Sequence, residues 1–300
     1  MKEIRKAVIP VAGMGTRLLP VTKSQPKEML PLGRKPCVQY IVEELAGEGL
    51  EEILFITGSN KRSIEDHFDT DELLRGKLQN AGQSAQLDSL RFEELNIGIY
   101  YTRQKRAAGL GDAISYARGF VGDEPFVVAL GDAVIESEEE NPLLRRMMKL
   151  FEEKEPAFVV AVRQVRPEDV SKYGILELAE RGELLEIKDI VEKPARHEAP
   201  SNYAVAARYI FKPEIFAFLE KTLPGTGGEI QLTDAMRMML KHGYKAYAVP
   251  LLKGEYRHDL GSFESYYKSF IHFALKDKEY GYRVRQYIQA ICDDQEEGGW

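Results

Sequence analysis

The chain has 300 residues, of which 44 % are hydrophobic, and its formal net charge is -7. This length allows one large core or two smaller ones, and the acidic balance argues against nucleic acid as the main partner. No run of about 18 apolar residues occurs, which argues against a membrane-spanning helix, and the first residues lead into a strand-like segment without a signal-peptide pattern. The only cysteines are Cys37 and Cys292. We therefore expect a cytoplasmic globular protein with two unrelated free thiols.

The first half of the chain alternates between strand-like and helix-like segments. It opens with a β-branched run over residues 6–11, which is typical of a buried strand in a parallel sheet. Further strands are expected at 53–56, 97–101 and 126–130, and helices at 38–45, 63–68, 71–79 and 142–154. This alternation predicts an α/β layered sheet.

The pattern changes after about residue 158, where short turns rather than helices separate the strands. Strands are expected at 158–165, 175–178, 184–191, 203–211 and 246–250, and helices at 213–221, 232–242, 263–275 and 282–292. The second half therefore predicts an antiparallel or mixed β section appended to the first, followed by two C-terminal helices. Residues 293–300 are charged and contain glycine, which predicts a flexible tail.

Two glycines, Gly13 and Gly15, follow the first strand. They allow a sharp turn that directs several backbone N–H groups toward one point, an arrangement that suits a phosphate. Arg17 and Lys27 supply side-chain charge for the same anion. Five basic residues and no acidic residue lie between Ile4 and Lys27, so the positive charge is local and indicates a site.

The spacing of these glycines excludes two common phosphate loops. A dinucleotide-binding G-x-G-x-x-G motif needs a third glycine where this chain has Leu18. A P-loop of the form G-x-x-x-x-G-K-[ST] is absent. The phosphate site must therefore belong to another class.

The string Gly13-Met14-Gly15-Thr16-Arg17, followed by Pro26-Lys27-Glu28-Met29-Leu30-Pro31, resembles the opening of the sugar-nucleotide pyrophosphorylases (nucleotidylyltransferases). Among them it looks most like the bacterial UTP–glucose-1-phosphate uridylyltransferases. The likeness extends from Lys6 to about Tyr287. It implies a Rossmann-like mixed, mainly parallel sheet flanked by helices, in one domain over residues 1–292. Within it, residues 1–155 would bind nucleotide, 156–260 the sugar, and 261–292 would form helices that can contact another subunit.

The resemblance also implies a reaction. UTP and glucose 1-phosphate would give UDP-glucose and pyrophosphate by direct in-line displacement with Mg²⁺, without a covalent intermediate. Such chemistry needs charge neutralisation and alignment rather than a protein nucleophile. The residues implied to hold the triphosphate are Ala12, Gly13, Gly15, Thr16, Arg17 and Lys27, with Arg17 and Lys27 as catalytic cations.

Asp132 follows the buried strand at 126–130 and so lies at the carboxyl end of a central strand, where open α/β sheets bind ligands. Position alone leaves two interpretations open, a Mg²⁺ ligand and a capping residue of a turn. The resemblance implies the metal ligand, although the closest relatives usually have Pro-Asp where this chain has Gly-Asp. Asp259 resembles the second metal-contacting aspartate, and it also fits an ordinary helix N-cap neighbourhood.

Several further residues receive roles from the resemblance. Glu192 would bind sugar hydroxyls, Lys193 the sugar phosphate as a third catalytic cation, and Gly174 would allow backbone approach to glucose. Gln104 would contact the uracil edge, with room from Gly109 and with Glu28 facing the base. Glu229 would approach the sugar, in a string whose Thr233 or Asp234 is expected to cap a helix.

Two alternatives remain open at this stage. One is a thymidylyltransferase-type sister enzyme with the same chemistry. The other is a catalytically silent regulatory paralogue, against which the intact Gly15-Thr16-Arg17 string argues. The five histidines show no metal-ligand spacing and are expected mostly at the surface. A homodimer or homotetramer is expected because the resembled family forms both.

Overall fold

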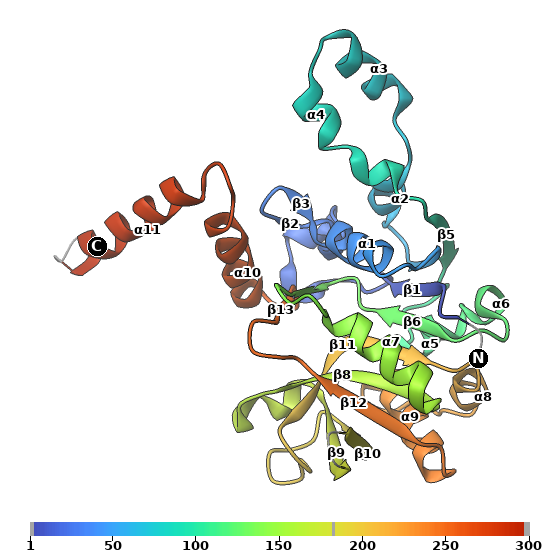
Figure 1. The fold of residues 1–300 in the computed structure, drawn as a ribbon. Coiled ribbons are helices and arrows are strands. Elements are labelled where there is room, and N and C mark those ends of the chain that lie inside the picture. The colour runs from blue at the N-terminus through green and yellow to red at the C-terminus, as the bar shows by residue number, and fades with distance from the viewer. Residues whose placement is uncertain (1–2, 182–183, 297–300) are drawn as a thin grey trace.

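The computed structural model describes residues 3–181 and 184–296, and its centre is one nine-stranded mixed sheet (Figure 1). From one edge to the other the strands are β5 (Gly98–Arg103), β4 (Glu52–Thr57), β1 (Lys6–Pro10), β6 (Phe126–Ala129), β11 (Tyr203–Phe211), β8 (Phe158–Gln164), β12 (Ala246–Pro250), β10 (Leu184–Glu192) and β9 (Gly174–Arg181). β5, β4, β1 and β6 are parallel. The parallel sheet expected in the first half is therefore present.

The strands of the second half extend this same sheet. β11 runs antiparallel to both β6 and β8, β12 is parallel to β8, and the β9–β10 hairpin closes the far edge. The mixed α/β architecture expected from the sequence is confirmed. The two halves meet along the β6–β11 pairing, so a residue at the end of either strand can reach the same space.

Helices cover both faces of the sheet, because alternate strand residues point to opposite sides. Ile9 packs into one core and its neighbour Val8 into the other. The first core lies under α1 (Cys37–Gly47), α2 (Arg62–Phe68) and α7 (Leu143–Lys154). The second lies under α5 (Leu110–Ser115), α6 (Arg118–Val121), α8 (Ile215–Leu219) and α9 (Leu232–Lys241).

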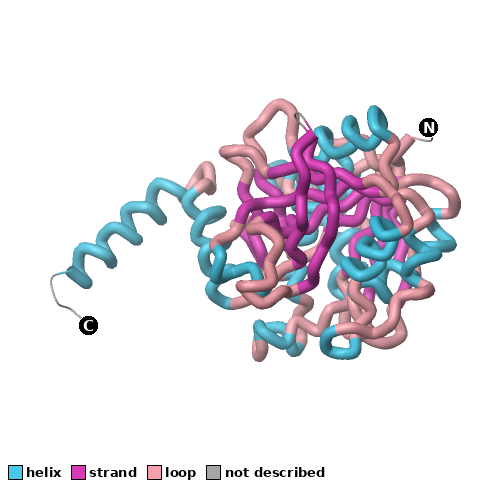
Figure 2. Tube along the Cα trace, turned by 90° about the horizontal axis from the view of Figure 1, so that it is seen from below, coloured by secondary structure: helices cyan, strands magenta, loops and turns pink. Residues whose placement is uncertain are grey.

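Two segments extend beyond these layers (Figure 1). α3 (Glu72–Asn80) and α4 (Ser84–Asp88) form a lobe beyond α2. α10 (Phe263–Leu275) begins at a capping box between Ser262 and Ser265, and α11 (Gly281–Glu296) follows it and stands clear of the body (Figure 2). Residues 293–296 are therefore helical, while residues 297–300 of the expected tail lie outside the described residues.

The sequence patterns missed two short antiparallel sheets of two strands each. β7 (Ala133–Glu136) pairs with β13 (Tyr256–Asp259), and β2 (Pro31–Leu32) pairs with β3 (Lys35–Pro36). Neither pair contains a long apolar or alternating run, so periodicity could not reveal them. Short 3₁₀ turns cover Thr16–Leu18, Val21–Lys23, Lys27–Met29, Arg91–Glu94, Pro167–Lys172 and Thr226–Gly228.

Two simpler expectations can be compared directly. Both cysteines are free, Cys37 buried and Cys292 exposed, as expected. Within residues 3–181 and 184–296, no helix has both the length and the apolar character needed to cross a bilayer.

One buried ion pair anchors α1 to the sheet. Arg208 on β11 is fully buried and binds Glu44 through two hydrogen bonds, Nε to Oε1 at 3.1 Å and Nη2 to Oε2 at 2.6 Å. Its Nη1 donates to the carbonyl of Ala207 at 3.0 Å. Removing one partner of such a pair leaves a buried charge uncompensated.

We expect Glu44→Ala to lower the free energy of unfolding by about 3 kcal/mol, because it strands the Arg208 guanidinium. Urea denaturation followed by circular dichroism measures the change. Glu264→Ala is the matched control, since its pair with Lys268 is exposed on both sides and exposed ion pairs contribute little to stability. Equal effects of the two substitutions would contradict the assigned weight of the buried pair.

Candidate active site

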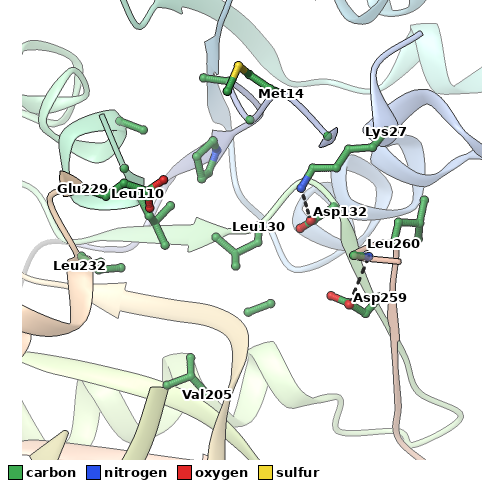
Figure 3. A pocket seen from close by; sticks show the side chains of 18 of the residues that line it. Met14, Lys27, Leu110, Leu130, Asp132, Val205, Glu229, Leu232, Asp259 and Leu260 are labelled. Atoms are coloured by element: carbon green, nitrogen blue, oxygen red, sulfur yellow. Dashed lines mark hydrogen bonds and ion pairs between the residues drawn. The ribbon is translucent and has the colours of Figure 1, made fainter. Parts of the chain in front are cut away.

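A cleft of about 550 Å³ opens at the carboxyl ends of β1 and β6 and is closed from the other side by the second half of the chain. Its lining includes every candidate site residue named above except Lys193. Figure 3 shows Lys27, Asp132 and Asp259 on one side of this cleft, with Glu229 and Leu110 opposite. The fold therefore brings together residues that are up to 247 positions apart in the sequence, from Ala12 to Asp259.

The turn after β1 is held in place by the conformation of a glycine and by one side-chain hydrogen bond. Gly15 has a φ of 66°, which favours glycine, and the Thr22 hydroxyl donates to its carbonyl at 2.7 Å. At Gly13 an added Cβ would lie 3.8 Å from Lys27 Nζ, so the lysine runs close along the turn. Arg17 is exposed in the cleft and makes no hydrogen bond or ion pair with any described residue. The turn thus offers a free guanidinium beside open backbone.

Lys27 Nζ contacts Asp132 Oδ2 at 2.5 Å, which ties the turn to the end of β6. Burial opposes the charged form of Lys27, but Asp132 and Glu28 outweigh it and raise the pKa of Lys27. Burial likewise opposes ionisation of Asp132, yet Lys27 holds the pKa of Asp132 below its ordinary value. Both groups are therefore charged at neutral pH. Position 131 favours glycine, because an added Cβ would lie 2.5 Å from Val11 Cγ1.

Glu28 lines the cleft but is only 1 % exposed, and its carboxylate receives a hydrogen bond from Lys61 at 2.8 Å. Burial raises the pKa of Glu28, and Lys61 opposes that rise. Lys61 was missed by the sequence analysis. It follows β4 in a loop with no motif, so no spacing rule connects it to Glu28.

The second aspartate, Asp259, reaches the cleft at the end of β13, which pairs with β7. Asp259 pairs in register with Ala133, directly after Asp132, and the Leu260 N–H donates to the Asp132 carbonyl at 3.0 Å. The N-cap of α10 is Ser262, so Asp259 does not cap that helix. The two carboxylates therefore face one cleft, as a shared metal site requires.

The end of the cleft expected to hold sugar is built from β9, β10 and α9. Gly174 lies opposite Glu192 in the hairpin, and a Cβ there would come within 3.0 Å of Thr233 Cγ2. The Thr233 hydroxyl donates to Glu192 Oε2 at 3.0 Å, and no side chain caps α9, so the expected capping role of Thr233 or Asp234 is wrong. Lys193 has a φ of 44° and lies outside the cleft lining, with its Nζ 3.3 Å from Glu192 Oε1.

The end expected to hold the base is organised by Gln104. Its Nε2 donates to Asp112 Oδ2 at 2.6 Å and to the Gly109 carbonyl at 3.3 Å. Because an ionised carboxylate only accepts hydrogen bonds, Asp112 fixes the amide so that its oxygen is the free acceptor. Gly109 has a φ of 108°, and a Cβ there would lie 2.6 Å from the Ile230 carbonyl. Glu229 therefore lies beside Gly109.

Three further residues at the cleft were missed. Arg257 and Tyr173 line it, and Arg163 lies behind the tyrosine ring, with the two guanidinium groups 5.6 and 5.3 Å from the ring centre. Arg257 donates to Asp259 at 2.7 Å, but its Nε and Nη1 are buried without a partner among the described residues, as is Nε of Arg163. Burial lowers the pKa of Arg163, and Arg257 adds to this effect. Arg257 and Asp259 are two apart on β13, which is the only sequence signal.

Comparisons with known proteins agree with this geometry. Residues 6–274 match the nucleotidyl transferase family. The chain is 43 % identical to a UTP–glucose-1-phosphate uridylyltransferase of Staphylococcus epidermidis over 293 residues, 97 % of this chain and 99 % of the relative. It is 42 % identical to a UTP–glucose-1-phosphate uridylyltransferase of Bacillus subtilis over 297 residues, 99 % of this chain and 100 % of the relative.

The fold is also similar to that of a solved structure, a UDP-glucose pyrophosphorylase complexed with UDP-glucose. The TM-score is 0.81 at 41 % identity, over 91 % of this chain and 99 % of the other. Family match, sequence identity and fold all cover nearly the full length. The chain therefore belongs to the nucleotidyl transferase family.

Proposed function

We propose that this protein transfers the uridylyl group of UTP to glucose 1-phosphate and releases UDP-glucose and pyrophosphate. The names of relatives that match nearly the whole chain support this activity. The observation that carries it is the arrangement of the cleft, in which the glycine turn, Arg17 and Lys27 face Asp132 and Asp259. A strand-turn phosphate site opposite paired carboxylates fits a nucleoside triphosphate with its metal.

The reaction joins two anions, so the protein must neutralise charge and align the reacting groups. A phosphate oxygen of glucose 1-phosphate attacks the α-phosphorus of UTP, and the bond from that phosphorus to pyrophosphate breaks. The residues lining the described cleft include no serine, cysteine or histidine. Direct in-line displacement needs no protein nucleophile, because the attacking oxygen belongs to the sugar phosphate.

On the nucleotide side, the backbone N–H groups around Ala12, Gly13, Gly15 and Thr16 would bind the triphosphate. Arg17 is unpaired and would stabilise the charge that grows on the leaving pyrophosphate. Lys27 would exchange part of its contact with Asp132 for a phosphate oxygen. Each role needs only the groups that already line the cleft.

The donor set fits Mg²⁺. Asp132 directly precedes Ala133, which pairs with Asp259, so the two aspartates offer hard carboxylate oxygens close together. Mg²⁺ favours a few carboxylates supplemented by water and substrate phosphates. Both residues would hold the ion, and the low pKa of Asp132 keeps its carboxylate ionised. When bound, Mg²⁺ would neutralise phosphate charge in the cleft.

On the sugar side, Glu192 and the backbone at Gly174 would bind glucose hydroxyls, and Lys193 would hold the sugar phosphate. Lys193 is 40 % exposed, and within the described part of the chain its ammonium pairs with Glu192 alone, so a rotamer change would bring it to the cleft edge. Arg257 has unpaired buried N–H groups beside the same space. We include it among the groups that attract the substrate anions.

Gln104 would read the base. Its oxygen is the free acceptor, because Asp112 holds the amide nitrogen, and it therefore matches the N3–H donor of uracil. Thymine carries the same donor, so this contact leaves the thymidylyltransferase alternative open. Cytosine lacks it. Glu28 would face the base from a position held by Lys61, and Glu229 would approach the substrate beside Gly109.

We further propose one nucleotidyltransferase domain over residues 1–292, in the cytoplasm, assembled as a homodimer or homotetramer. The continuous sheet supports one domain, and the two free cysteines support a reducing compartment. α11 supports assembly. It stands clear of the body with exposed Tyr282, Tyr287 and Ile291, and an isolated helix of this length is marginal in water. Arg283 and Asp293 near its opposite ends favour an antiparallel second copy.

A substrate panel tests the proposal. Four nucleoside triphosphates are combined with glucose, galactose and N-acetylglucosamine 1-phosphates, and pyrophosphate release is measured against blanks without sugar. We expect UTP with glucose 1-phosphate to be fastest and CTP to be slower by about 100-fold or more, because Gln104 presents an acceptor. Faster turnover of dTTP would favour the thymidylyltransferase, and no release with any pair would favour the silent paralogue.

Two substitutions separate the nucleotide and sugar sides. Arg17→Ala should lower kcat by roughly 100- to 1000-fold, because it removes stabilisation of the leaving group. Lys193→Ala should chiefly raise KM for glucose 1-phosphate. Steady-state kinetics with each substrate varied in turn measures both effects. Arg62→Ala and Lys188→Ala are controls outside the cleft, and near-wild-type constants for either test variant would refute its role.

Asp132→Asn should abolish Mg²⁺-dependent turnover, because the amide is a weaker, uncharged ligand. Activity is measured across a Mg²⁺ titration, with the thermal midpoint as a check on folding. Asp66→Asn, on an exposed pair with Arg62, is the control. An unchanged Mg²⁺ titration in the Asp132 variant would show that the metal assignment is wrong.

A further inference from the structure

Two histidines and a glutamate from three elements meet outside the cleft. Glu136 is the last residue of β7, His258 lies on β13 and His272 on α10. Glu136 Oε2 lies 3.1 Å from His258 Nε2 and 2.6 Å from His272 Nε2. The three ligand atoms all lie within 4.8 Å of one another. His258 is buried, whereas the histidines were expected mostly at the surface.

The two oxygens of Glu136 have different surroundings. Oε2 faces both imidazoles, whereas Oε1 accepts a hydrogen bond from Lys276 at 2.8 Å. One ligand oxygen directed at two imidazoles, with the other tied by an outer hydrogen bond, is how metal-binding carboxylates are commonly held.

We propose that Glu136, His258 and His272 form a binding site for a divalent metal that prefers imidazole, with Zn²⁺ as the best match. Tetrahedral Zn²⁺ places its N and O ligands at about 2.0–2.2 Å from the metal and so roughly 3.3 Å from one another. The two observed separations from Oε2 need only sub-ångström widening to reach that value. Imidazole ligands select Zn²⁺, Ni²⁺ or Co²⁺ over Mg²⁺.

The surroundings allow a fourth ligand. His272 is 31 % exposed and Glu136 17 %, so water can complete the coordination from the solvent side. Lys276 brings a positive charge, but its ammonium also binds Glu138 at 2.7 Å, which offsets that charge locally. The site is separate from the Mg²⁺ carboxylates, because none of its three residues lines the cleft.

The predicted effect is structural. The three residues connect the two-stranded β7–β13 sheet to α10, which leads into α11. Metal bound only by the folded chain stabilises it by mass action. The simpler alternative is that both imidazoles donate protons to Glu136 and no metal binds. Titration with Zn²⁺ distinguishes the two arrangements, because only the first binds the ion.

The test uses the full-length protein after treatment with a chelator and dialysis into buffer containing Mg²⁺. A Cys292→Ser background removes the exposed thiol. Zn²⁺ is titrated by calorimetry, and X-ray absorption at the zinc edge identifies its ligands. We expect one tight equivalent with two imidazole ligands, together with a raised thermal midpoint. The residues lining the described cleft contain no histidine, so imidazole ligation separates the two sites.

His272→Ala and Glu136→Gln should each weaken this binding by about 100-fold or more, and Lys276→Met by about 10-fold through the outer hydrogen bond. His197→Ala is the control, since its side chain is 82 % exposed and remote from the cluster in sequence. Two site variants guard against one failing to fold. No tight Zn²⁺, oxygen-only ligation, or unchanged affinity in both site variants would overturn the proposal. It stands or falls independently of the uridylyl transfer.

Discussion

The contact between Lys27 and Asp132 fixes the geometry of the cleft. It joins the segment that follows the β1 turn to the residue that follows β6. Each group alone would be costly to bury, and each is kept charged by the other. A buried ion pair contributes little net stability compared with apolar packing. Its value here is positional, because it holds a cation and a carboxylate side by side in the cleft.

The rest of the cleft is arranged around charge that the protein itself leaves unbalanced. Arg17 is unpaired, and Arg257 and Arg163 keep buried N–H groups without acceptors beside Tyr173. Buried donors without partners are rare in folded proteins and need a reason. In the function proposed above, a substrate anion would be the partner of the Arg257 donors, which line the cleft, whereas Arg163 lies behind the Tyr173 ring. Donors already fixed in place need no reorganisation when the charge of the reaction develops.

Much of this could be predicted from the sequence, because the strongest signals are local. The glycine turn, Arg17 and Lys27 lie within 20 residues of one another, and Asp132 follows a plainly apolar strand. α10 was predicted with its observed bounds, since its aromatic face recurs at helical spacing. The roles of these residues stay predictions, but their convergence on one cleft does not depend on the family likeness.

What could not be predicted depends on tertiary contacts. Lys61 meets Glu28 across 33 positions, and Arg257 meets Tyr173 across 84 positions. The β7–β13 pairing could not be predicted, because its strands are four residues long, have no apolar alternation and lie far apart in the sequence. The histidines show no ligand spacing, yet His258 and His272 lie together because β13 packs on α10. Spacing rules detect ligands on one element and miss those that three elements share.

The β7–β13 sheet also connects the cleft with the C-terminal helices. At one end its register sets Asp259 beside Ala133 and so fixes the distance between the two cleft carboxylates. At the other end Glu136 binds two histidines and Lys276, all but one of them on or just after α10. A contiguous set of contacts therefore runs from the cleft to the helix that carries α11. Because packed elements shift as units rather than bending continuously, anything that fixes α10 against the β7–β13 pair also constrains the placement of Asp259 relative to Asp132.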